Sequence, residues 1–195
     1  MTIMRTYWMK FFTLLLAVFM TVPLINTGQN AEAQIYMGRR GYVEFVSEAM
    51  KEDVIGKSNH LNGRIDTESR EVDFFVDLTT LKTGIDLRDE HMNENYLETH
   101  KYPFAEFFGK LQDELVSASG EPQDVTVKGD FTVHGVTRQI TVTGTVTPTE
   151  EGIRIEASWD LKLDDYNIPI PKVLTYRLSN DITINIDIKM KERSL

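Results

Sequence analysis

The sequence predicts an all-β protein, an extended eight-stranded antiparallel β-barrel with one short helix. Apolar and polar residues alternate in one segment after another, turn-forming residues separate these segments, and a single stretch favours a helix instead. The alternation is clear from Gly129 to Val142, where Phe131 and Val133 face away from Asp130 and Thr132. A hairpin alone is not stable in water, so neighbouring strands must cover its apolar face.

The turn of this hairpin is predicted at His134-Gly135. A two-residue reversal needs positive φ angles, which glycine adopts without steric cost. His134 continues the polar side of the strand, with Asp130 and Thr132, so its side chain is expected in solvent.

Four segments precede the hairpin: predicted strands at Tyr42 to Ser47, Val54 to Asp66 and Glu71 to Leu81, and a predicted helix at Asp86 to Glu98. Gly56 and Gly63 indicate bulges or bends, which a strongly curved sheet needs. In the helix, Leu87, His91, Met92 and Tyr96 can share one face, so we expect this helix to plug one end of a barrel.

The remaining strand patterns run from Phe104 to Val116, Val125 to Val133, Ile140 to Val146, Ile153 to Leu163 and Ile182 to Met190. Pro148 to Gly152 is a predicted turn, and the two prolines in Tyr166 to Arg177 predict an irregular connection. Eight one-faced strands fit a closed barrel or a two-sheet sandwich. Their length and their glycines favour the barrel, whose height of about 25 Å leaves room for side chains or one elongated ligand.

Residues 1–33 are predicted to be a signal peptide, followed by one domain over residues 34–195. Arg5 and Lys10 precede an apolar run from Phe11 to Ile25, and cleavage is expected between Ala33 and Gln34. A retained membrane anchor is the alternative, although the run is short for a membrane span. The chain has no cysteine, so a lipoprotein anchor is excluded and core packing must hold the domain together.

The acidic balance of the chain, a net charge of -9 with a pI near 5.0, argues against binding to nucleic acid or to anionic membrane surfaces. The predicted signal peptide and the absence of a cysteine predict a periplasmic or secreted protein without a stable membrane anchor. Association of two copies into a homodimer is left open.

Catalytic and metal-binding patterns are weak. Gly56-Lys57-Ser58 resembles the end of a phosphate loop, but Lys51 stands where its first glycine is needed. The four histidines lack metal-type spacing and have no cysteine partner, so solvated or capping roles are expected for them. The sequence therefore predicts no enzyme, no cofactor and no metal.

The apolar faces of the strands are the feature of the sequence that indicates a function. In a closed barrel these faces converge on one interior, which either packs solid or holds an apolar ligand. The tunnel lining predicted for the hollow case is Phe45, Phe74, Val76, Phe107, Phe131, Val133, Ile155, Trp159, Ile184 and Ile186.

The segment Gly129 to Thr137, followed by Ile140-Thr141-Val142, resembles the signature hairpin of the YceI-like proteins. Upstream residues match the family in order and spacing: Thr83-Gly84, Arg88-Asp89, His91-Met92, Lys101-Tyr102-Pro103, Ala105 and Phe107. The resemblance implies a lipocalin-like barrel, usually exported, whose studied members hold a polyisoprenoid-type lipid in an apolar tunnel, with no enzymatic role established.

The chain departs from the family at its opening, where Tyr36 to Tyr42 replaces the usual residues of the first strand, and at Met92, Arg138 and Gln139. The leading hypothesis is an exported protein that binds an isoprenoid, a quinone or a similar long apolar molecule. The alternatives are a filled barrel that acts in stress or through its surface, and, more weakly, an isomerase or hydrolase.

Overall fold

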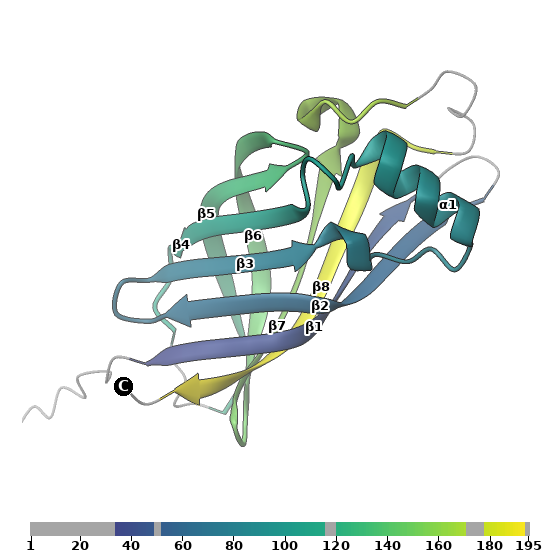
Figure 1. The fold of residues 1–195 in the computed structure, drawn as a ribbon. Coiled ribbons are helices and arrows are strands. Elements are labelled where there is room, and N and C mark those ends of the chain that lie inside the picture. Colours follow the sequence, from purple (N-terminus) through teal and green to yellow (C-terminus); the bar gives the residue numbers. More distant parts are fainter. Residues whose placement is uncertain (1–33, 49–51, 116–119, 171–177, 194–195) are drawn as a thin grey trace, which may run out of the picture. The chain divides into compact units, whose positions relative to one another are not determined.

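The computed structural model describes residues 34–48, 52–115, 120–170 and 178–193. Eight antiparallel strands pair in sequence order and close into a barrel, because the last strand pairs with the first (Figure 1). The strands are β1 (Ile35–Ser47), β2 (Val54–Asp66), β3 (Glu71–Asp77), β4 (Phe104–Leu111), β5 (Gln123–Val133), β6 (Val136–Thr149), β7 (Gly152–Lys162) and β8 (Asp181–Arg193). The predicted fold class is confirmed, whereas the predicted signal peptide lies outside the described residues.

The β5–β6 hairpin has the predicted two-residue turn. His134 and Gly135 both have positive φ, 52° and 71°, as a type I′ turn requires. The expectation that His134 lies in solvent is wrong, since its side chain is only 8% exposed. The left-handed backbone at the turn ends the strand alternation, so His134 does not continue the outward side of Thr132.

Several strands begin or end elsewhere than predicted. β1 starts at Ile35, seven residues before the predicted start at Tyr42. The sequence did not reveal this first half because register shifts around Gly38 and Gly41 interrupt the alternation of apolar and polar residues. β3 ends at Asp77, whose carboxylate accepts a hydrogen bond from the Thr79 backbone N–H at 2.9 Å and caps the short 3-10 turn η1 (Leu78–Thr80).

The predicted helix is present in two parts between β3 and β4. Helix α1 (Asp86–His91) continues as the π turn η2 (Met92–Tyr96), and both lie at one end of the barrel (Figure 1). A further 3-10 turn, η4 (Leu163–Tyr166), follows β7 at the start of the predicted irregular connection.

The wall between β2 and β3 is paired over only part of its length. The two strands pair from Asn62 with Phe75 to Ile65 with Val72. Beyond this ladder, Lys57 and Lys82 exchange two backbone hydrogen bonds of 2.9 and 2.8 Å. We call this part of the wall, where residues 54–61 of β2 face residues 78–83, the seam.

Candidate binding cavity

A cavity of about 700 Å³ occupies the interior of the barrel. Each of the eight strands contributes side chains to its wall, and nearly all of these are aliphatic or aromatic. The wall is apolar because inward positions alternate with outward polar ones along each strand, as in Ile153 and Ile155 against Arg154 and Glu156. Such a cavity is in the size range of small-molecule sites.

The structure places all ten residues of the predicted tunnel lining on the wall of this cavity. Five are buried: Phe74, Val76, Phe131, Val133 and Ile155. The other five, Phe45, Phe107, Trp159, Ile184 and Ile186, are partly buried and pack against the core. That any of them contacts a ligand is part of the proposal made below.

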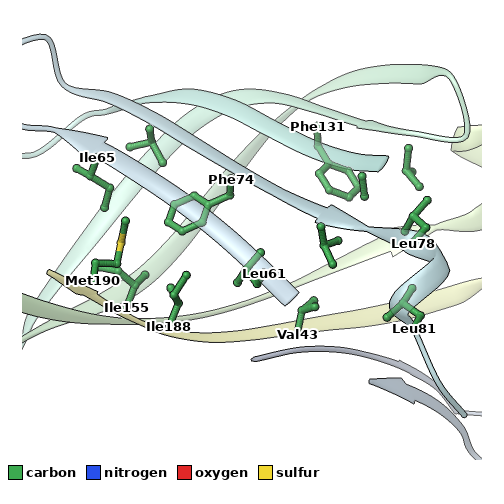
Figure 2. Close-up of a cluster of buried hydrophobic side chains, with 14 of the residues drawn as sticks. Val43, Leu61, Ile65, Phe74, Leu78, Leu81, Phe131, Ile155, Ile188 and Met190 are labelled. Carbon is green, nitrogen blue, oxygen red and sulfur yellow. The ribbon is translucent and has the colours of Figure 1, made fainter. Parts of the chain in front are cut away.

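One end of the barrel is packed solid. Seven side chains there are between 1% and 4% exposed and do not border the cavity: Tyr36, Ile65, Leu111, Val146, Ile153, Ile188 and Met190. We call this set the floor. Figure 2 shows Ile65, Ile188 and Met190 gathered together, away from Leu78 and Leu81.

The other end is covered by residues 78–97, which we call the mouth segment. Leu87, Met92 and Tyr96, predicted to share one helical face, all border the cavity. Sequence reasoning missed Leu78 and Leu81, which are 3% and 5% exposed and also line it. A strand that continues to Leu81 puts Leu78 on the apolar face but Leu81 on the opposite face. The strand instead ends at Asp77, and the turn η1 brings both side chains to the cavity.

A polar cluster fixes α1 to the chain before it. The buried carboxylate of Asp89 accepts hydrogen bonds from the Thr83 backbone N–H at 2.7 Å and from the Thr83 hydroxyl at 2.6 Å, and Arg88 Nε donates to the same hydroxyl at 3.0 Å. Burial raises the pKa of Asp89, but the hydrogen bonds from Thr83 and the charges of Lys82 and Arg88 outweigh it and hold this pKa below its ordinary value.

The polar groups near the cavity are few. Thr83, Arg88 and His91 border it from the mouth segment, and Trp159 borders it from β7. Three carboxylates also border it, those of Glu44 on β1, Glu52 just before β2 and Glu106 on β4. The Trp159 indole Nε1 is buried without a hydrogen-bond partner among the described residues, and its ring meets Phe131 edge to face with centroids 5.9 Å apart. The wall is therefore suited to hydrocarbon along its length and to a polar group at the mouth.

The described residues lack the features of a metal or phosphate site. No group of three or more His, Asp or Glu side chains that could hold a metal occurs in the described ranges. Gly56-Lys57-Ser58 lies within β2 rather than in a loop before a helix, so it lacks the context of a phosphate loop. In the part of the chain that the structure describes, no helix has the length and apolar character to cross a membrane.

Residues 37–190 match the family model of the YceI-like domain. The chain belongs to the YceI-like family. The match runs from β1 to β8, so it includes the mouth segment and every floor residue except Tyr36.

Curated relatives of this YceI-like chain include UPF0312 proteins. UPF0312 proteins from several strains of Pseudomonas putida are 27% identical to it over 184 residues, which cover 86% of this chain and 93% of theirs.

Solved structures share the fold at low sequence identity. A polyisoprenoid binding domain from Saccharophagus degradans, implicated in plant cell wall breakdown, aligns with a TM-score of 0.71 and 21% identity, covering 83% of this chain and all of that one. BcnA from Burkholderia cenocepacia gives 0.65 and 16%, covering 79% and 96%. The Campylobacter jejuni YceI protein gives 0.59 and 18%, covering 76% and 90%.

Proposed function

We propose that this YceI-like protein is an exported binding protein, and not an enzyme, that holds a long apolar lipid of the isoprenoid or quinone type for transport, storage or sequestration. The cavity of about 700 Å³, apolar along its wall and enclosed by all eight strands, carries this proposal. The likeness of the fold to a polyisoprenoid binding domain supports the lipid class.

Burial of hydrocarbon supplies the binding free energy. Each Å² of apolar surface removed from water contributes about 25 cal/mol, so a buried area of a few hundred Å² yields several kcal/mol before ordering costs. An unpaired polar group carried to the same depth loses a few kcal/mol of hydration. The apolar tail therefore lies inside the barrel and the polar head lies at the mouth, beside Thr83, Arg88 and His91.

Bound lipid is tested first on protein purified without detergent. Native mass spectrometry should show a mass excess that organic extraction removes. Adding a long isoprenoid or fatty chain to the extracted protein should then shift the fluorescence of Trp159, which borders the cavity. A fixed fluorescence together with an extract free of lipid would replace this proposal with a filled-barrel interaction protein.

Charge inside the cavity should abolish lipid retention. Phe131→Asp places a carboxylate on the apolar wall, whereas Thr132→Asp places one on the opposite side of the same strand. We expect lipid loss or unfolding for the first variant and lipid retention for the second. Ile155→Lys and its neighbour Glu156→Lys form a second matched pair on β7. Equal retention in both members of each pair would contradict a ligand in this cavity.

Export follows from residues 1–33 and is tested separately. The mature protein should begin at Gln34 or within a few residues of it. N-terminal sequencing of protein recovered from outside the cytoplasm checks this, and a sequence beginning at Met1 would overturn it.

A further inference from the structure

We infer that the floor of the barrel limits the length of the apolar tail that the protein accepts, with Met190 and Ile188 as the determining residues. This inference rests on the proposed binding function. It goes further because it assigns a specificity role to residues outside the cavity wall.

The cavity ends where the floor begins. Ile155 borders the cavity, whereas Ile188, its cross-strand partner on β8, does not and is 1% exposed. One step further along the same strand pair, Ile153 and Met190 are each 1% exposed and face no open space. A tail that enters at the mouth therefore meets packed side chains at this level.

Two glycines of β1 make this packing achievable. A Cβ at Gly38 would lie 2.7 Å from Ile188 Cδ1 and 2.9 Å from Met190 Cγ, and a Cβ at Gly41 would lie 2.6 Å from Ile188. The side chains of Ile188 and Met190 thus rest directly on the β1 backbone, in space that any other residue would fill. Tyr36 completes this side of the floor, held by a 2.6 Å hydrogen bond from its hydroxyl to Gln34 Oε1.

The depth and volume of the cavity limit the length of the tail that fits inside it. Cavity-lining residues of β7 and η4 run from Ile155 to Leu163, which at about 3.3 Å per residue and a tilt of about 40° is a depth of about 20 Å. At about 30 Å³ for each non-hydrogen atom, a cavity of about 700 Å³ holds on the order of 20 carbons. Longer chains must leave their excess at the mouth, in water.

The test uses extracted protein and two series of probes with constant head groups, straight-chain fatty acids and isoprenoid alcohols, titrated against Trp159 fluorescence. Affinity should rise about fourfold for each added methylene until the tail reaches the floor, and then level off. Binding with no such plateau would overturn the inference and leave the proposed function standing. If no probe of any length binds, the inference and the proposed function are both overturned.

Variants then move the plateau in opposite directions. Met190→Ala removes three non-hydrogen atoms from the floor, so the plateau for fatty acids should move about two to three carbons longer. Ala157→Phe fills space beside the deepest part of the cavity, so the plateau should move shorter. A thermal melt shows whether Met190→Ala folds. If it does not fold, Ala157→Phe still tests the inference.

Ile182→Ala is the matched control. It also removes three non-hydrogen atoms, from a buried cavity-lining side chain of β8 at the mouth end. It should weaken binding at every tail length without moving the plateau. A plateau that shifts equally in Ile182→Ala and Met190→Ala, or in neither the floor variant nor Ala157→Phe, would overturn the assignment to the floor.

Discussion

His134 joins three separate parts of the chain at the mouth end of the barrel. Its Nδ1 lies 3.1 Å from the Tyr166 carbonyl oxygen of η4, and its Nε2 lies 3.0 Å from Glu98 Oε2, just after η2. Both partners are hydrogen-bond acceptors, so whichever ring nitrogen carries a proton has an acceptor to donate to. Tyr102 packs against the ring edge to face, with centroids 4.9 Å apart.

Replacing His134 should therefore destabilise the fold. His134→Asn keeps a residue that tolerates the left-handed backbone but loses both contacts, and leaving Glu98 and the Tyr166 carbonyl without this donor should cost about 1–3 kcal/mol. His100→Asn, at an exposed position, is the control and should change stability little. Urea unfolding of both variants measures the difference, and equal midpoints would contradict the structural role of His134.

The sequence predicted the turn at this residue but not its burial. The turn depends on local chemistry, since Gly135 permits positive φ. Burial of His134 depends on Glu98 and Tyr166, which are 36 and 32 residues away along the chain. The alternation of apolar and polar residues near His134 contains no information about such distant partners.

Helix α1 is too short to be stable by itself and depends on its attachment to the barrel. The hydrogen bonds between Asp89 and Thr83 supply that attachment on one side. The buried side chain of Met92, the residue after the helix, supplies it on the other. The helical spacing of its apolar face could be predicted from sequence, whereas the π turn that follows depends on packing over the barrel.

Acid should loosen α1 through Asp89. Because its pKa is lowered in the folded protein, the ionised carboxylate stabilises the fold above its unfolded pKa, about 3.9, and this stabilisation is lost as pH falls below that value toward the folded pKa. We expect the Asp89→Asn variant to be less stable near neutral pH and to lose part of the acid dependence.

Asp86→Asn, at an exposed position of the same helix, is the control for this prediction. Thermal melts from pH 3 to 7 measure both variants. An acid dependence that is unchanged in Asp89→Asn would show that another group is responsible.

At the scale of the whole molecule, side chains fill one end of the barrel, the floor, and a cavity occupies the rest of its interior. Alternation in the sequence identified which side of each strand faces inward, and the length and glycines of the strands favoured a closed barrel over a sandwich. It could not predict where the interior is empty, because that depends on the summed side-chain volume at each level. Gly38 and Gly41, which obscured the first half of β1 in the sequence, are the residues that let the floor pack.

The seam makes the stability of this closed wall uneven. Between Asn62 and the start of β2, its described links are the two backbone hydrogen bonds of Lys57 and Lys82 and a 2.6 Å contact between the Ser58 and Thr80 hydroxyls. By contrast, β7 and β8 pair continuously from Gly152 to Lys162. Local opening at the seam breaks few bonds and leaves the rest of the circle intact.

The amides of the protein should therefore exchange with deuterium on two separate timescales. Those of Lys57 and Lys82 should exchange through brief local openings, and those of Ile155 and Ile188 only when the whole barrel unfolds. Thr80→Val should speed the first pair and leave the second unchanged, and uniform rates in both would mean that the wall opens only as a unit. Opening of the seam would therefore widen the wall beside the mouth segment while β7 and β8 stay paired.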